Sequence, residues 1–412
     1  MSADPTITPE LPLSFHRLTF VADGAEVLVG RAGTDSYAVL PPDGAEALKR
    51  MMRGDGPGEV AAWYEETHGE LLDIEDFVAS MSELGFLLQP GETADAADPP
   101  VRLQRLARAA FSLPAFMAYG LVIVAWVVAM SNAPSLVPRP QHVFFSDSAM
   151  LVQLLIVFGQ IPWLLLHEGA HVLAGRKLGL PSELGFGTRL YFVVFETRMP
   201  SLLSVPRRQR YLAFIAGMLL DVLAICGLGL LAYALRGSTG MWHTVYVLAL
   251  AMAFPIFTRF AYQFLLFLQT DVYYIAATAL GCYDLHAATR TLVANRLWRV
   301  IRRPERARPV SDWTERDLRV ARWYAPFFAV GVTVMLAVWV FALIPIMTGL
   351  VHIAAQALSA GASDARFWDA TLFIVLNVAQ IAFFAYLALR NRARGRKEHA
   401  PAAAPIETGA FS

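Results

Sequence analysis

A His-Glu-x-x-His pattern stands at residues 167–171, in the sequence HEGAH. On a helix, positions i and i+4 lie on one face about one turn apart, so two such imidazoles can bind one metal ion. The glutamate between them would lie beside the metal-bound water, where it can act as a general base. We therefore predict that His167 and His171 bind one Zn²⁺ per chain and that Glu168 is the catalytic base.

The surroundings of this pattern strengthen the metal interpretation. The motif continues the apolar run IVFGQIPWLLL, and so it lies inside a segment long enough to cross a membrane. An ionised glutamate between two histidines is costly at that depth unless it has partners. The alternative is that both histidines are satisfied by interhelical hydrogen bonds. If the segment ends at the basic connector after it, His167 lies roughly 15 Å inside the membrane on the cytoplasmic side.

Two histidines leave a catalytic zinc short of its usual third protein ligand. Asp271 lies in the apolar sequence FLLFLQTDVYYIAATALGC and is the best candidate, although it could instead be an interfacial carboxylate at a helix end. Asp221, in FIAGMLLDVLAI, is the second candidate. It could instead pair with Arg259, which also falls in an apolar segment and needs a counter-ion. Two histidines and a carboxylate suit several divalent ions, so another metal is not excluded.

The composition predicts that most of the chain is membrane-embedded. Of the 412 residues, 56% are hydrophobic and 17% are charged, whereas soluble proteins average about a quarter charged. Six apolar stretches are long enough to span a bilayer as helices. They lie near 111–131, 149–175, 211–235, 250–280, 324–347 and 367–390. We expect the fourth to be one main helix preceded by a shorter segment, with a kink or re-entry at Pro255.

Arginine and lysine residues alternate across these spans. The connectors 176–210 and 281–323 carry seven and ten of them, whereas the loops 132–148, 236–243 and 348–366 carry one each. By the positive-inside rule both termini are cytoplasmic. The same placement argues against a nucleic-acid partner, since topology alone accounts for the arginines. Cys226 and Cys282 are far apart and predict neither a disulfide nor a thiolate metal site.

The N-terminal region has the character of a small soluble domain. Residues 26–40 alternate like two short strands, and amphipathic helices are expected near 42–53, 57–68 and 73–84. We predict a domain at 1–88, a linker at 89–108, a membrane domain at 109–390 and a basic, then disordered, tail at 391–412. The fold class is a polytopic α-helical membrane protein with a small α+β, winged-helix-like cytoplasmic domain. Beyond the HExxH segment, Gly185, Gly187 and the alternating residues 190–196 predict a hairpin, which could offer a strand edge to an extended substrate.

Three blocks of the membrane region resemble the site-2 protease family of intramembrane zinc metalloproteases: LLLHEGAHVLAGRKLG, AGMLLD and QTDVYY. The resemblance implies that His167, His171 and Asp271 bind zinc, that Glu168 is the base, and that Asp221 occupies a substrate-facing position usually held by asparagine. The sequence departs from the family pattern, because Met218 replaces a proline and Val272 a glycine. These departures indicate a divergent branch.

The N-terminal region resembles PqqD-type peptide-binding domains in SYAVLPPDGAEALKRMMRGDGPGEVAAWYEE and DIEDFVASMSELGFLL. This resemblance implies that residues 10–88 capture the leader of a peptide precursor as an added strand; a generic small helical domain is the alternative. The sequence as a whole predicts a zinc endopeptidase of the bacterial inner membrane. The rival predictions are a peptide exporter, an immunity protein or a membrane sensor with a degenerate metal site.

Overall fold

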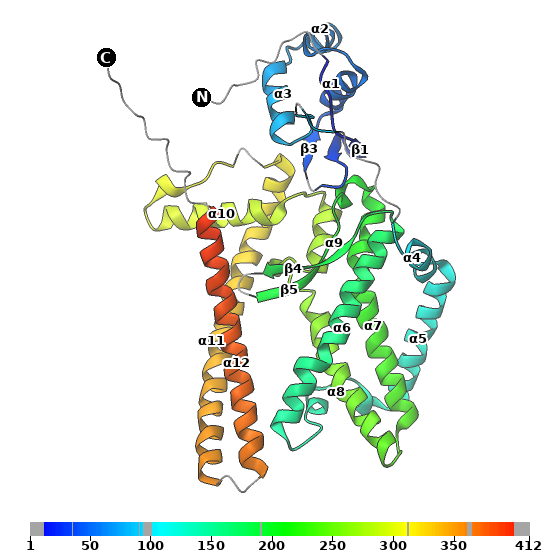
Figure 1. Cartoon of the computed structure of the whole chain (residues 1–412), viewed down its shortest axis with the longest axis vertical. Coiled ribbons are helices and arrows are strands. Elements are labelled where there is room, and N and C mark those ends of the chain that lie inside the picture. Colours follow the sequence, from blue (N-terminus) through cyan, green and yellow to red (C-terminus); the bar gives the residue numbers. More distant parts are fainter. Residues whose placement is uncertain are drawn as a thin grey trace.

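The computed structural model describes residues 12–34, 36–89, 91–93, 101–189, 192–310, 313–360 and 365–398. A small N-terminal domain stands on one end of a set of long helices (Figure 1). Six of these helices are long and apolar enough to cross a membrane, which confirms the predicted polytopic helical class. They are α5 (Leu113–Asn132), α6 (Ala149–Lys177), α7 (Arg207–Leu235), α8 (Met241–Tyr262), α11 (Glu315–Ala360) and α12 (Ala365–Glu398).

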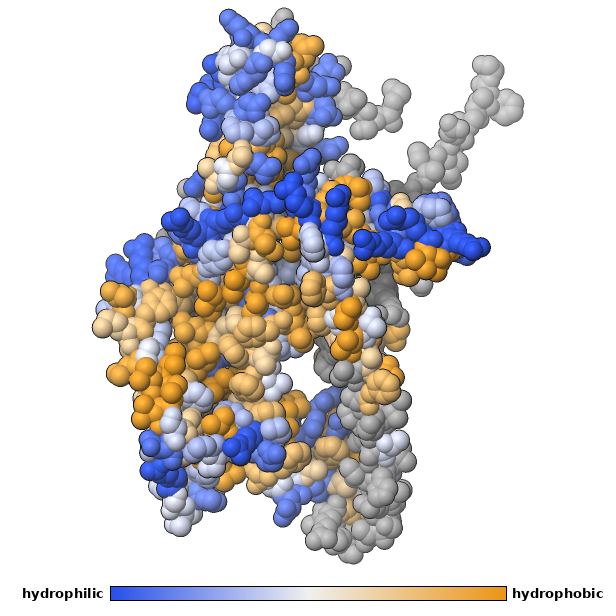
Figure 2. All heavy atoms as spheres, turned by 180° about the vertical axis from the view of Figure 1, so that it is seen from behind, coloured by the Kyte–Doolittle hydropathy of each residue, from blue (hydrophilic) through white to orange (hydrophobic). Residues whose placement is uncertain are grey.

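The surface of the long helices is apolar over a broad belt. Figure 2 shows this belt between hydrophilic residues at the end near the N-terminal domain and at the opposite end. Large apolar side chains of these helices are exposed, for example Leu121 of α5 at 69% and Phe327 of α11 at 74%. An apolar surface of this extent would be unfavourable in water. The belt therefore indicates an integral membrane protein whose outer surface faces lipid.

The fourth crossing is broken at a different place from the one predicted. Pro255 lies within the continuous helix α8, and the chain leaves helical geometry at residues 263–270. After the short 3₁₀ helix η4 (Leu266–Leu268), α9 (Asp271–Leu280) resumes. The prediction of a short segment followed by the main helix was therefore wrong: the longer helix, α8, comes first and the shorter helix, α9, follows. A proline removes one backbone hydrogen bond, and a helix can accommodate it as a kink. A full break, as at residues 263–270, needs side chains that satisfy the freed backbone groups.

The N-terminal domain consists of one antiparallel sheet and three helices. The strands β1 (Leu18–Asp23), β2 (Glu26–Arg31) and β3 (Tyr37–Leu40) pair in sequence order. The helices are α1 (Pro42–Arg53), α2 (Pro57–His68) and α3 (Ile74–Glu83), which confirms the three predicted helices and two of the strands. Their core includes Leu48, Met51, Val60 and Phe86, each 0% exposed. Strand β1 was not predicted.

The N-terminal domain docks on the membrane domain through specific polar contacts. The Thr19 hydroxyl donates a hydrogen bond of 2.7 Å to Ser204 Oγ, and the backbone N–H of Gly33 donates one of 2.7 Å to Ser201 Oγ. The Tyr283 hydroxyl donates to Asp23 Oδ2 at 2.7 Å. Ser201 and Ser204 lie in the connector before α7 (Arg207–Leu235), and Tyr283 lies just after the short helix α9 (Asp271–Leu280). The domain stands above the end of the helices rather than beside them (Figure 1).

The remaining elements are short. Part of the predicted linker is helical, as α4 (Gln104–Ala110), and packs against α6. The hairpin predicted after the HExxH segment is present, as antiparallel strands β4 (Glu183–Arg189) and β5 (Phe192–Arg198). Helix α10 (Leu285–Val300) precedes α11. Further 3₁₀ turns are η1 (Pro134–Leu136), η2 (Pro140–Val143), η3 (Leu202–Ser204) and η5 (Pro304–Arg306).

Candidate metal centre

Two helices bring the three predicted metal ligands together. His167 and His171 lie one turn apart on α6, and Asp271 is the first residue of α9. His167 Nε2 and His171 Nε2 are 3.2 Å apart, and each is 3.3 Å from Asp271 Oδ2. Both histidines are buried. The group could therefore hold a metal ion, as predicted from the HExxH spacing and from the isolated acid in an apolar sequence.

The triangle formed by these three atoms has the size that a tetrahedral zinc site requires. Ligand atoms about 2.0–2.1 Å from a tetrahedral ion lie about 3.3–3.4 Å from one another. Asp271 Oδ2 is buried and forms no hydrogen bond with any described residue, although both Nε2 atoms are near it. Where the lone pairs of such atoms point at one another, they repel unless a cation lies between them. The donor set thus fits a divalent metal.

The second nitrogen of each histidine is held by a hydrogen-bond acceptor. His171 Nδ1 lies 2.6 Å from the backbone carbonyl of Ala213, and His167 Nδ1 lies 3.0 Å from Asp221 Oδ2. A carbonyl oxygen can only accept, so His171 Nδ1 carries the proton and its Nε2 has a free lone pair. Acceptors at the far nitrogen orient most metal-binding histidines in this way. Both imidazoles therefore present Nε2 to the site.

A glycine on α7 makes room for this arrangement. A Cβ atom on Gly217 would lie 2.5 Å from His167 Nε2 and still closer to His171 Nε2. Real Cβ atoms do not approach other heavy atoms so closely, so the site requires a residue without a side chain at this position. Gly217 belongs to the block AGMLLD, yet its closeness to both histidines was not predicted. The one sequence feature that pointed toward it was the small-residue block AGMLLD following the HExxH segment.

The break between α8 and α9 positions Asp271. The side-chain carbonyl of Gln263 accepts a hydrogen bond of 3.1 Å from the Asp271 backbone N–H, and the Thr270 hydroxyl donates to the Gln263 backbone carbonyl at 2.6 Å. Gln263 and Thr270 are both buried. A broken helix is tolerated at membrane depth only where such groups satisfy its backbone. The two polar residues thus hold the carboxylate at the first turn of α9.

The β4–β5 hairpin contacts the predicted base. The Thr197 hydroxyl on β5 lies 2.9 Å from Glu168 Oε2 and 3.0 Å from the Glu168 backbone carbonyl. Glu168 is half-buried, next in sequence to the first histidine. The hydroxyl restricts the rotation of the Glu168 side chain, which a base needs in order to meet its proton in a fixed geometry. The hairpin therefore serves the site, while its role as a substrate edge stays a prediction.

Asp221 contacts the candidate metal ligand His167 on its far side, at Nδ1. It is fully buried, and its oxygens contact His167 and Arg259. The predicted pairing of Asp221 with Arg259 is present in the structure. Asp221 is not part of the His167–His171–Asp271 group, so among the two acids considered as third ligand the geometry selects Asp271. The substrate-facing role that the family resemblance implies for Asp221 stays a prediction.

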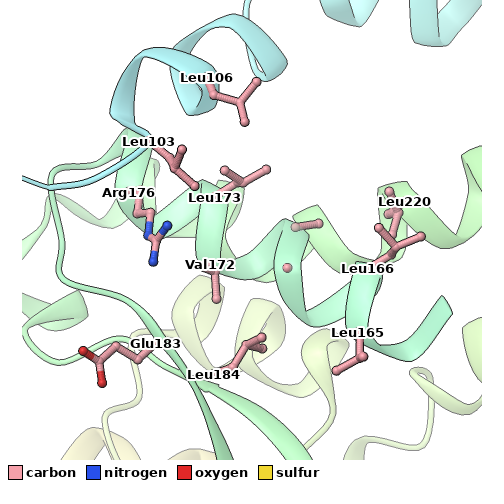
Figure 3. Close-up of a pocket in the computed structure, with 12 residues that line it drawn as sticks. Leu103, Leu106, Leu165, Leu166, Val172, Leu173, Arg176, Glu183, Leu184 and Leu220 are labelled. Atoms are coloured by element: carbon pink, nitrogen blue, oxygen red, sulfur yellow. The ribbon is translucent and has the colours of Figure 1, made fainter. Parts of the chain in front are cut away.

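An apolar groove of about 660 Å³ lies along the same stretch of α6, and Gly169 and Ala170 of the HExxH motif line it (Figure 3). It is lined by Leu103 and Leu106 near α4, by leucines of α6 and α7, and by Leu184 of β4. Arg176 and Glu183 are its charged residues, and the three candidate metal ligands do not line it. The groove therefore borders the HExxH motif but does not include the candidate ligands.

No protein-family model matches this sequence, and neither a curated protein nor a solved structure shows significant similarity to it. The functional assignment consequently rests on the residues and the geometry described above.

Proposed function

We propose that this chain is a zinc endopeptidase that hydrolyses a peptide bond of a membrane-associated or leader-bearing substrate within the membrane. The observation that carries the proposal is the convergence of His167, His171 and Asp271 next to Glu168. A purely structural metal site has no need of a base beside it, and HExxH glutamates act as bases in metallopeptidases. The motif resemblance to site-2 proteases supports the same activity.

The chain's own residues divide the chemistry between them. A zinc ion held by the three ligands would polarise the scissile carbonyl and acidify a water molecule. Glu168, oriented by Thr197, would take the proton of the attacking water and deliver it to the leaving amine. The free edges of the hairpin would pair with an extended substrate backbone. Because the site lies about ten residues before the end of α6, water and substrate would enter from the cytoplasmic side of a bacterial inner membrane, where both termini would lie.

The first expected result is one zinc ion per chain in the detergent-purified protein. Asp271→Ala should lose the metal, because two imidazoles alone bind zinc too weakly to retain it through purification. Asp221→Ala should keep part of the zinc, since the Asp221 carboxylate contacts His167 at Nδ1, the nitrogen that faces away from the metal. Metal analysis of the three proteins tests this. Absence of zinc from the wild-type protein, even after reconstitution, would favour the exporter, immunity-protein or sensor alternatives.

The N-terminal domain is proposed to recognise the substrate. Its sheet has an outer strand, β3, to which an extended leader could add. Deleting residues 1–100 should then lower the efficiency of cleavage of a leader-bearing peptide by about 100-fold, because tethering is lost. Cleavage of the same peptide without its leader should be little affected. Fluorogenic peptides with and without the leader would measure both rates.

A sensor in which the N-terminal domain carries the function would give a different result. All metal-dependent activity would then disappear on deletion, while zinc stayed bound. The variant Thr19→Val is a matched control in the full-length chain, because it removes a contact with Ser204 and leaves β3 intact. It should cleave both peptides with nearly unchanged efficiency.

A further inference from the structure

A chain of three polar side chains from three membrane helices ends on one metal ligand. Arg259 of α8 donates from Nε to Asp221 Oδ2 at 3.3 Å and from Nη2 to Asp221 Oδ1. The same Oδ2 of Asp221, on α7, lies 3.0 Å from His167 Nδ1 on α6. Asp221 is 0% exposed and the Arg259 side chain 17% exposed. The two donor groups of the guanidinium bind the two oxygens of one carboxylate, which restricts the rotation of the Asp221 side chain.

Arg259 supplies the counter-ion that the buried position of Asp221 requires. A fully buried carboxylate without a counter-ion is strongly unfavourable. Among the described residues, Arg259 is the lysine or arginine that forms an ion pair with Asp221. The candidate metal group already contains the acid Asp271, and Glu168 follows His167 in the sequence. Arg259 therefore lets a third carboxylate orient His167 without adding net negative charge.

The two histidines differ in this respect. His171 is oriented by the backbone carbonyl of Ala213, which no side-chain substitution removes. The orientation of His167 instead depends on a side chain, and this side chain depends on a second one. A defect at the Asp221–Arg259 pair should consequently act on one ligand and leave the other in place.

We propose that Arg259 is a positioning residue of the metal centre: by donating to both carboxylate oxygens of Asp221 it fixes that side chain, which in turn holds His167 with Nε2 toward the metal. The proposal rests on the metal site of the proposed function and adds to it a residue of α8 that supplies no ligand. Acceptors of this kind change metal affinity by about 10–100-fold. The pair should thus tune how tightly the metal is held, independently of peptide cleavage.

The test uses the full-length protein in detergent and measures zinc affinity by competition with a chromophoric chelator. Arg259→Gln and Asp221→Asn should each weaken zinc binding by about 10–100-fold. Arg259→Lys keeps the positive charge but loses the two-donor geometry of the guanidinium. Its zinc affinity should therefore lie between that of these two variants and that of the wild type. Thr258→Val is the matched control, because Thr258 is exposed on the same helix and, among the described residues, its hydroxyl donates a hydrogen bond only to the Phe254 carbonyl. It should bind zinc like the wild type.

A second readout separates positioning from a general loss of folding. Cobalt bound in place of zinc should give the visible absorption of a tetrahedral site in the wild type, and an altered spectrum in Arg259→Gln and Arg259→Lys. Unchanged affinity and spectrum in any of these variants that elutes as a folded protein would overturn the proposal. If Arg259→Gln and Asp221→Asn fail to fold, the zinc affinity and cobalt spectrum of Arg259→Lys test the proposal.

The outcomes also separate this proposal from the proposed function. Wild-type protein that binds no metal would refute the metal centre itself. Wild-type protein that binds zinc and loses it in Asp271→Ala, but not in the Arg259 or Asp221 variants, would leave the metal centre standing and refute the positioning role alone.

Discussion

Glu168→Gln should abolish peptide hydrolysis while leaving one zinc ion per chain. Glutamine keeps the shape of the side chain and can still accept the hydrogen bond from Thr197, but it cannot take a proton from water. General-base catalysis contributes about 10²–10⁴-fold to the rate, so we expect a loss of about 10³-fold or more. Single-turnover cleavage of a fluorogenic peptide and metal analysis on the same preparation would measure both quantities.

Two further variants interpret that result. His171→Ala should lose metal and activity together, because it removes a ligand rather than the base. Thr197→Val should keep the metal and lose only part of the activity, since Glu168 stays in place but rotates more freely. Loss of zinc from Glu168→Gln would instead mean that Glu168 is a ligand, and the mechanism proposed above would be wrong.

The sequence predicted what depends on local patterns. HExxH spacing places two histidines on one face of a helix, and an acid such as Asp271 is conspicuous in an apolar sequence. Apolar length predicted the six candidate spans, and amphipathic periodicity predicted α1, α2 and α3 close to their observed bounds. These features require no knowledge of how distant segments pack.

The features that were missed depend on long-range contacts. The break between α8 and α9 forms where Gln263 satisfies the backbone of Asp271, whereas the sequence pointed to the more conspicuous Pro255. Strand β1 was missed because four of its six residues are only partly buried, which leaves no strict alternation to recognise. The connection from Arg259 through Asp221 to His167 crosses three helices. The pairing of Arg259 with Asp221 could be predicted from their charges, but the contact of Asp221 with the candidate metal ligand His167 could not.

Gly217→Ala should abolish metal binding, although the substitution adds one methyl group and replaces no ligand. The new carbon would lie within 2.5 Å of His167 Nε2 and closer still to His171 Nε2, inside the space where the two nitrogens converge. Overpacking of a rigid interior destabilises a protein by about 1–3 kcal/mol. Here the relief of that strain requires α7 to move away from α6 or the imidazoles to rotate away from each other. Either movement destroys the ligand geometry, so we expect zinc affinity to fall by more than about 100-fold.

Two other glycines provide matched controls for this effect. An added Cβ meets no atom within 4 Å at Gly227, on the same helix, or at Gly169, inside the HExxH motif itself. Alanine is the better helix former by about 1 kcal/mol, so Gly227→Ala and Gly169→Ala should be at least as stable as the wild type and should bind zinc normally. Equal zinc binding in all three alanine variants would show that α6 and α7 separate easily. The close approach at Gly217 would then not define the site. Loss of zinc in Gly217→Ala alone would instead locate the metal against this one helix surface, because only there does a methyl group compete with it for space.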